Sequence, residues 1–213
     1  MKLYDYFRSS AAYRVRIALN MKGVALERAF IHLRKGVQRE PDYLATNPQG
    51  LLPALVLDDG TVLTQSLAIV EYLDETHPKP PLLPADAEGR ARVRGIAQAI
   101  ACDIHPIDNL RVLRYLLHTV GTTEAQKDAW YAHWIDVGLA ALETRLGRES
   151  ATGTFCHGET PTLADVVLVP QMANARRVDM DLSPYPTLVR IDAACRALPA
   201  FAAADPARQP DAE

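Results

Sequence analysis

Three short polar loops hold the residues whose types and spacing could do chemistry. Arg8, Ser9 and Ser10 stand between a strand-like segment (1–7) and a helix-like segment (11–20). Free N–H groups at a helix start favour an anion and lower the pKa of a nearby thiol, and a serine hydroxyl can donate to a thiolate. The alternative is that the serines simply cap the helix, which is a more common role. Because no GxSxG motif is present, a serine hydrolase has no local support.

The other two loops offer groups that suit a peptide. Asn47 to Pro53 contains two prolines; if the Leu52-Pro53 bond is cis, the backbone of Leu52 turns outward and can pair with an extended chain. An ordinary trans proline at an edge strand is the alternative. Gln65 and Ser66 open a helix, where an amide and a hydroxyl suit a carboxylate, again with a simple cap as the alternative. Together the three loops match a short peptide that contains cysteine.

A small mixed sheet is the element that must position these loops at one end. Strand patterns at 1–7 and 25–32 flank the helix at 11–20, which indicates a parallel pair with a helical crossover. Strand patterns at 53–57 and 61–63 join through an Asp-Gly turn, which predicts a hairpin. Ser66 is then predicted to cap a helix that runs to about 77. This order predicts four strands with helices on the faces of the sheet.

The second part of the chain has helical patterns and almost no strand patterns. They run at 86–118, 123–147, 163–178 and 187–198, after a proline cluster at 78–81 that predicts a stiff linker. Thr162 and Asp165 have the spacing of a capping box. We therefore expect one domain at 1–80 and a second at 86–213, with the tail 205–213 lying over the surface.

Composition excludes several classes of protein. The 213 residues are 48% hydrophobic and 23% charged, which is typical of a folded globular chain, and the net charge of −3 disfavours a nucleic-acid partner. The three cysteines form no CxxC pair and the histidines have no metal-ligand spacing, so we expect no metal and a reducing compartment. No secretory leader and no apolar run of about 20 residues is visible, so we expect a cytoplasmic protein without a membrane partner.

The residues of the first loop and helix resemble the signature of the zeta-class glutathione transferases, the maleylacetoacetate and maleylpyruvate isomerases. The similarity extends over essentially the whole chain. The matching residues are Tyr4, Tyr6-Phe7-Arg8-Ser9-Ser10, Arg14-Val15-Arg16-Ile17-Ala18-Leu19, Asn47-Pro48, Pro53, Gln65 to Leu73, Leu82-Leu83-Pro84, Asp165, Val169-Pro170-Gln171, Ala175-Arg176-Arg177 and Gln209-Pro210-Asp211. The resemblance implies a thioredoxin-like glutathione-binding domain (1–80), an all-helical substrate-binding domain (86–213) and a homodimer.

The resemblance also implies roles for individual residues. Ser9 would activate the glutathione thiol, with Ser10 beside it as a second catalytic residue. The other glutathione-binding residues would be Gln38, Leu52 with Pro53, Gln65, Ser66, His105 and Asn109. Ala11 stands where relatives often have cysteine, which argues against any mechanism that needs a protein thiol at that place. For His105 a packed histidine at the helix kink before Pro106 is an equal alternative.

The family's substrates carry two carboxylates, and arginine binds a carboxylate with two parallel hydrogen bonds. The resemblance points to Arg8, Arg111 and Arg177 as the residues that bind the substrate carboxylates. Arg176 is expected to be a surface charge, and Arg14 and Arg16 are expected to form structural ion pairs.

The function implied is glutathione-dependent cis–trans isomerisation of maleylacetoacetate to fumarylacetoacetate in the breakdown of aromatic compounds. The thiolate of glutathione would add to the conjugated double bond and leave after rotation, so that glutathione is not consumed. The alternatives are a maleylpyruvate isomerase of gentisate breakdown, a glutathione transferase or dehalogenase acting on small α-halo acids, and a non-catalytic binding module. The sequence leaves the choice between the two isomerase substrates open.

Overall fold

The computed structural model describes residues 1–213, which form two compact units. The first unit contains Met1–Leu82 together with Ala197–Glu213, and the second contains Leu83–Arg196. The boundary at Leu82 follows the proline cluster of the predicted linker. Each unit is described by itself below.

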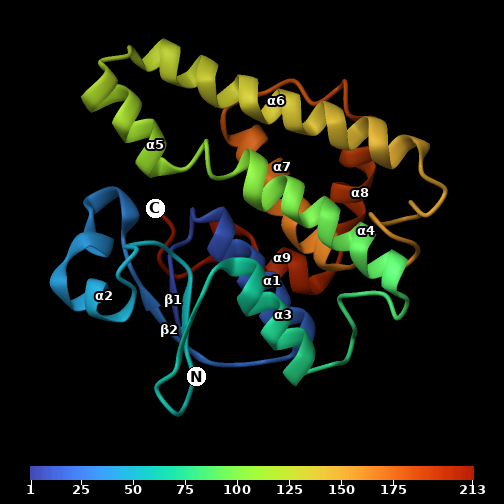
Figure 1. The fold of residues 1–213 in the computed structure, drawn as a ribbon, viewed down its shortest axis with the longest axis horizontal. Coiled ribbons are helices and arrows are strands. Elements are labelled where there is room, and N and C mark those ends of the chain that lie inside the picture. The colour runs from blue at the N-terminus through green and yellow to red at the C-terminus, as the bar shows by residue number, and fades with distance from the viewer. The chain divides into compact units, whose positions relative to one another are not determined.

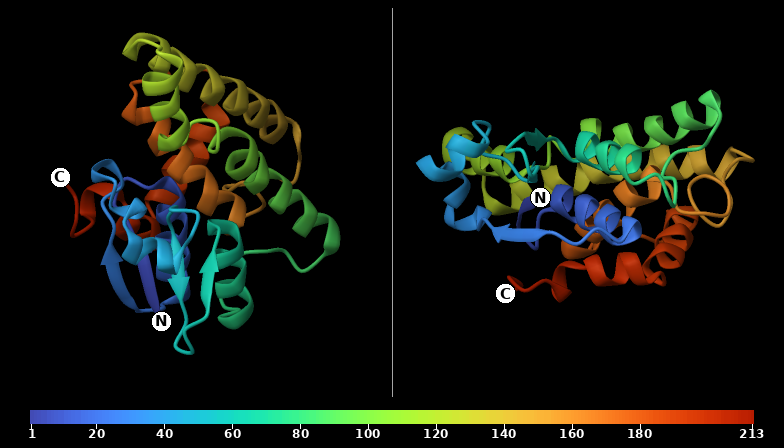
Figure 2. Two further views of the ribbon diagram at one scale, coloured as in Figure 1. Left: turned by 60° about the vertical axis from the view of Figure 1, so that its left-hand side comes forward. Right: turned by 90° about the horizontal axis from the view of Figure 1, so that it is seen from below.

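A four-stranded mixed sheet forms the centre of the first unit, as predicted (Figure 1). The strands are β1 (Lys2–Asp5), β2 (Glu27–Phe30), β3 (Ala54–Val56) and β4 (Val62–Thr64), in the order β2-β1-β3-β4. β1 is parallel to β2 and antiparallel to β3, and β3 and β4 form the hairpin seen in cyan in Figure 2.

Helix α1 (Ser10–Lys22) connects the two parallel strands, and α3 (Ser66–Thr76) follows the hairpin. Ser9 caps α1, and Gly23 ends it with a φ of 65°, a left-handed conformation that glycine adopts without a steric penalty. Every residue of α1 except Asn20 and Met21 is buried. Short helical turns η1 (Leu33–Lys35), η2 (Val37–Arg39) and α2 (Pro41–Thr46) fill the segment between β2 and β3.

The C-terminal segment differs from the expected domain division. α9 (Pro199–Ala204) and the turn η5 (Pro206–Arg208) belong to the first unit, and α9 packs against α1. The physical reason is that α9, whose Phe201 is fully buried, packs against α1, and its carbonyl groups accept hydrogen bonds from side chains of α1. Asn20 Nδ2 donates to Ala200 O at 2.9 Å, and Arg16 Nε donates to Ala204 O at 3.1 Å. Hydrogen bonds from side chains to backbone carbonyl groups 180 and 188 positions away leave no pattern in the sequence, so this attachment was not predicted.

The second unit contains helices and no strand, as predicted. Its helices are α4 (Ala87–Gln98), the π-helical turn η3 (Ala99–Ile104), α5 (Leu110–Tyr115), the π-helical turn η4 (Leu116–Val120), α6 (Glu124–Arg148), α7 (Leu163–Arg177) and α8 (Pro186–Arg196). The single helix expected over 86–118 is interrupted in the structure, where residues 105–109 form turns. Pro106 lies in this segment and has no backbone N–H to donate to a helical hydrogen bond.

Helix α7 is the core of the second unit, with every residue from Leu163 to Met172 buried. The predicted capping box is present: Asp165 accepts from the backbone N–H of Thr162 at 2.7 Å, and the Thr162 hydroxyl interacts with the third helical residue. Trp130 and Trp134 stack edge to face at 5.7 Å between ring centroids but remain partly exposed, so they belong to the core only in part.

No helix of the structure is long and apolar enough to cross a bilayer.

Candidate functional site

The register of the sheet places the three polar loops at one end of the first unit. Tyr4 pairs with Ala54, so the loop after β1 lies beside the start of β3. Ala54 in turn pairs with Thr64, so Pro53 lies beside Gln65. The loops predicted to act together are therefore neighbours. Tyr6 and Phe7 of the first loop and Leu52 of the second also share one buried cluster with Tyr43.

Ser9 is the N-cap of α1, and its Oγ accepts from the Ala12 N–H at 3.2 Å. Ser9 therefore caps the helix, and this role still leaves its hydroxyl able to donate a hydrogen bond to a ligand. A hydroxyl has two lone pairs and one proton, and the cap uses a lone pair. The O–H of Ser9 can still donate to an anion placed at the start of α1, where the helix dipole also favours negative charge. Ser10 is the first residue of α1 and is buried.

The loop from Asn47 to Pro53 is held by side chains of the protein. Tyr43 donates its hydroxyl to Leu51 O at 2.6 Å, and Asn47 Nδ2 donates to the same oxygen at 2.8 Å. Burial raises the pKa of Tyr43 to about 12, so this phenol stays protonated as a donor. The Leu52-Pro53 bond is cis, which is the isomer that the sequence interpretation considered.

Gln38 lies beside this loop. The backbone oxygen of Gln38 is 3.0 Å from the position that a Cβ on Gly50 would take, so η2 and the loop are in close contact. The side chain of Gln38 is 6% exposed, and its carboxamide oxygen has no hydrogen-bond partner. A buried acceptor without a donor is costly, which makes this atom a candidate for a ligand contact.

Gln65, not Ser66, is the N-cap of α3, which corrects the prediction for Ser66. The backbone of Gln65 has a φ of 69°, an uncommon value for a residue other than glycine, and its side chain makes no capping hydrogen bond. Ser66 is buried as the first helical residue, and its Oγ accepts from Arg14 Nη1 at 3.1 Å. Because Arg14 is 1% exposed, it places a buried positive charge behind Ser66. The sequence did not predict this hydrogen bond, since Arg14 lies in α1 and Ser66 in α3.

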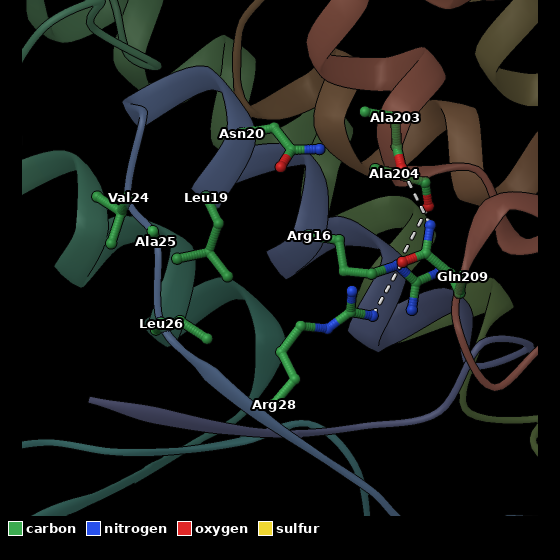
Figure 3. Close-up of a pocket in the computed structure, with 10 residues that line it drawn as sticks. All are labelled: Arg16, Leu19, Asn20, Val24, Ala25, Leu26, Arg28, Ala203, Ala204 and Gln209. Carbon is green, nitrogen blue, oxygen red and sulfur yellow. Dashed lines mark hydrogen bonds between the residues drawn. The ribbon is translucent and has the colours of Figure 1, made fainter.

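Arg16 has the structural role that was predicted for it. Its Nη1 is 2.8 Å from Asp5 Oδ1, and Arg28 pairs with Asp5 Oδ2. Arg16 and Arg28 line a cavity of about 210 Å³ on the side of α1 shown in Figure 3. In that view Arg28 and Arg16 are directed to Gln209 and to the carbonyl of Ala204. Because both guanidinium groups are paired with the buried Asp5 carboxylate, they are not candidates for a substrate carboxylate.

Arg8 lies in the loop between β1 and α1 and is partly exposed. Burial raises the pKa of the neighbouring Tyr6 hydroxyl, and the positive charge of Arg8 partly opposes that rise. Two carboxylates of the C-terminal segment, Asp211 and Glu213, raise the pKa of Tyr6, whereas the charge of Arg8 lowers it. Arg8 therefore shares its surroundings with acidic groups of the same unit.

The second unit carries the remaining candidate residues. His105 Nε2 is 3.4 Å from Asn109 Nδ2, and Asn109 caps α5 by accepting from the Arg111 N–H at 3.1 Å. These two candidates are therefore neighbours at the turn where the first long helical pattern is interrupted. Arg111 is exposed on the first turn of α5.

Arg176 and Arg177, the last two residues of α7, donate hydrogen bonds to different kinds of acceptor. Arg176 pairs with both oxygens of Asp192, at 2.8 and 3.1 Å. Arg177 instead donates to Asn174 Oδ1 at 2.8 Å and to the Tyr131 hydroxyl at 2.7 Å. Both acceptors of Arg177 are neutral, so they orient the guanidinium without cancelling its charge. This is an arrangement that suits the binding of a carboxylate.

Asp108, between His105 and Asn109, is a residue that sequence reasoning did not single out. It is 8% exposed and neither carboxylate oxygen has a hydrogen-bond partner, and burial raises its pKa to about 7. An aspartate before an asparagine gives no sequence signal of such burial. No group of three or more histidine, cysteine or acidic side chains is arranged to hold a metal ion.

Comparison with known proteins identifies the family of this chain. Residues 8–76 match the glutathione S-transferase N-terminal domain. The chain is 51% identical over 212 residues to a probable maleylacetoacetate isomerase of Vibrio cholerae, covering 99% of this chain and 97% of that protein.

Two solved structures are similar over their full lengths. One is a holo maleylpyruvate isomerase described as a bacterial zeta-class glutathione S-transferase, with 50% identity, a TM-score of 0.97 and complete coverage of both chains. The other is a maleylacetoacetate isomerase of Methylobacterium extorquens with bound malonate and glutathione, with 45% identity, a TM-score of 0.98 and complete coverage of both chains. The chain belongs to the zeta-class glutathione transferases, the family of the maleylacetoacetate and maleylpyruvate isomerases.

Proposed function

We propose that this protein is a glutathione-dependent cis–trans isomerase of maleylacetoacetate. The observation that carries the proposal is the group of polar atoms at one end of the first unit's sheet. Ser9 has a hydroxyl proton to donate, Gln38 has a buried oxygen without a donor, and Gln65 and Ser66 open α3 in front of Arg14. A solved relative at 45% identity contains both glutathione and a small dicarboxylate.

The residues of the first unit fit glutathione. The orphaned oxygen of Gln38 can accept a hydrogen bond from a peptide donor, which would remove the cost of its burial. The first N–H groups of α3, with the hydroxyl of Ser66 and the buried charge of Arg14 behind it, suit a carboxylate such as the γ-glutamyl end. Leu52 and Pro53 are assigned to the backbone of the cysteinyl residue on the resemblance alone.

When bound, glutathione supplies a thiolate that can add to a conjugated double bond and leave again after rotation. The protein's part is to keep the sulfur ionised and to orient the substrate. Ser9 can donate a hydrogen bond, and the positive end of the α1 helix dipole adds a favourable field, so both lower the pKa of a thiol at this place. Ser10, next to it in the first turn of α1, is assigned to the same site.

Arginines are assigned to the two carboxylates of the substrate. Arg177 is the best supported of them, because its two acceptors are neutral and hold the guanidinium in place. Arg8 and Arg111 are assigned with it on the resemblance. His105 and Asn109 are assigned to glutathione because they match residues of the family that reach toward it, and they are neighbours in the structure.

Replacing Ser9 tests the mechanism. We expect Ser9→Ala to lower kcat by about 10²-fold or more, the loss typical of removing one donor to a developing anion. Because Ser9 also caps α1, the variant should lose about 1 kcal/mol of stability as well. Thr123→Ala, which removes the cap of α6, is a matched control: it should lose similar stability and keep its turnover. Unchanged turnover in Ser9→Ala would remove Ser9 from the mechanism.

An ultraviolet assay distinguishes the possible substrates. Rates on maleylacetoacetate, maleylpyruvate and dichloroacetate are measured with and without glutathione. We expect isomerisation only with glutathione, and fastest on maleylacetoacetate; a faster rate on maleylpyruvate would assign the protein to gentisate breakdown. Retention on immobilised glutathione without any turnover would indicate a binding module. We also propose a homodimer, to be checked by light scattering of the purified protein.

A further inference from the structure

The C-terminal segment reaches the loop that carries the candidate catalytic serine. The Phe7 N–H donates to Asp211 Oδ2 at 2.9 Å, a contact between residues 204 positions apart in the chain. Phe7 is two residues before Ser9 and is 7% exposed. In Figure 1 the C-terminus, in red, lies at the opposite end of the sheet from the N-terminus, where β1 leads into α1.

Three side chains form hydrogen bonds with the backbone of this loop. The Tyr6 N–H donates to Asp5 Oδ1 at 2.7 Å, and Arg16 Nη2 donates to Phe7 O at 3.0 Å. Asp211 accepts the intervening Phe7 N–H. The Ser9 N–H then donates to Tyr6 O at 2.9 Å, so the position of Ser9 depends on the peptide groups that these side chains hold.

The tail is itself fixed before it reaches the loop. Gln209 is 6% exposed; its Oε1 accepts from Arg28 Nη2 at 2.9 Å, and its Nε2 donates to Ala203 O at 3.0 Å (Figure 3). The same Nε2 also donates to Asp205 O at 2.7 Å. Beyond Asp211, Glu213 Oε1 lies 2.6 Å from His32 Nε2. Asp211 therefore contacts the loop from a segment that is attached on both sides of it.

We propose that Asp211 is a positioning residue, which sets the orientation of the Ser9 hydroxyl by accepting the Phe7 N–H. The proposal rests on the function proposed for Ser9. Asp211 touches neither the thiol nor the substrate in this role. Its carboxylate acts by the geometry of one hydrogen bond, so an amide oxygen in the same place should replace it.

Two substitutions of Asp211 and one control test this role in the full-length protein. Asp211→Ala removes the acceptor, and Asp211→Asn keeps an acceptor oxygen while removing the charge. Glu213→Gln removes an acid from the same tail without changing the contact to Phe7. For each variant we would measure kcat and KM, the unfolding temperature, and the pKa of the bound glutathione thiol from its thiolate absorbance.

We expect Asp211→Ala to lower kcat about tenfold, which corresponds to about 1.4 kcal/mol, and to raise the thiol pKa, with little change in the KM for the substrate. Asp211→Asn should recover most of the kcat, and Glu213→Gln should resemble the parent. Equal losses in the Ala and Asn variants, or a thiol pKa that stays unchanged in Asp211→Ala, would overturn the proposal. If Asp211→Ala folds and keeps the parental kcat while Ser9→Ala is impaired, the role proposed for Asp211 is overturned and the mechanism proposed for Ser9 stands. Parental turnover in Ser9→Ala would instead overturn the mechanism proposed for Ser9.

Discussion

Two regions of the molecule bury or orient charge in opposite ways. Asp5 in the first unit is fully buried and lies between Arg16 and Arg28, so its charge is balanced within the protein. In the second unit Asp108 is buried without a hydrogen-bond partner, and Arg177 is held by two neutral acceptors. The comparison teaches that residue type alone does not decide the role of a charged group. A group paired with an opposite charge inside the protein is structural, whereas one without such a pair can bind a charged ligand or change its protonation with pH.

The two arginines at the end of α7 show the same contrast within one turn of helix. Arg176 forms a pair of hydrogen bonds with Asp192, whose side chain is 3% exposed. Arg177, the next residue, donates instead to Asn174 and Tyr131, two side chains that carry no charge. Adjacent positions of identical type are therefore expected to give different phenotypes when each is replaced by alanine.

The largest effect is expected at Asp5. Asp5→Ala would leave Arg16, which is 3% exposed, without its carboxylate, and removing one member of a buried pair usually costs about 3–5 kcal/mol. We expect the free energy of unfolding in urea to fall by about that amount. Arg176→Ala serves as the comparison: it removes the more exposed member of its pair, and Asp192 still has Arg196 Nη1 at 3.9 Å, so the variant should cost about 1 kcal/mol. Equal losses in the two variants would contradict the view that burial makes the Asp5 pairs the more important.

A smaller effect, on catalysis, is expected at Arg177. Arg177→Ala should lower kcat/KM for the cis dicarboxylate by about 10- to 100-fold, since a hydrogen bond to a charged group contributes about 1.5–3 kcal/mol. Its unfolding temperature should change little, because the residue is exposed. Arg176→Ala is again the matched control, and steady-state kinetics should show nearly parental kcat/KM for it. The assignment of Arg177 would fail if both variants had the same kinetics.

The smallest effect is expected at Asp108 and depends on pH. The carboxyl has a pKa of about 7 in the folded protein against 3.8 ordinarily, so between these values the folded state binds the proton and the unfolded state does not. The contribution of Asp108 is therefore most favourable below about pH 4 and is lost as the pH rises to about 7. Asp108→Asn should reduce this loss and be more stable than the parent near pH 8, by on the order of 1 kcal/mol. Urea unfolding at several pH values checks this, and parallel pH profiles for variant and parent would exclude an elevated pKa.

Much of the fold was predictable because its elements are local. Alternation of apolar residues, the Asp-Gly turn and the Thr162–Asp165 capping box each depend on residues close in sequence, and the structure contains the corresponding strands, hairpin and helix. The position of the tail was not predictable, since Gln209 and Asp211 are attached through polar groups of distant residues. The sequence indicated only a kink before Pro106 in the helical pattern at 86–118, whereas the structure has turns there.

For the candidate site, the sequence by itself determined which residue types stand at the helix starts: Ser9 before α1, and Gln65 and Ser66 at α3. The order of the strands also predicted that these loops lie at one end of the sheet, and the register seen in the structure makes them neighbours. Only the tertiary structure decided which charges are balanced, that Arg14 lies behind Ser66, and that Asp211 contacts the loop before Ser9. The physical reason is that hydrogen bonds and ion pairs need contact within about 3–4 Å, and such contacts between residues tens to hundreds of positions apart exist only after the chain has folded.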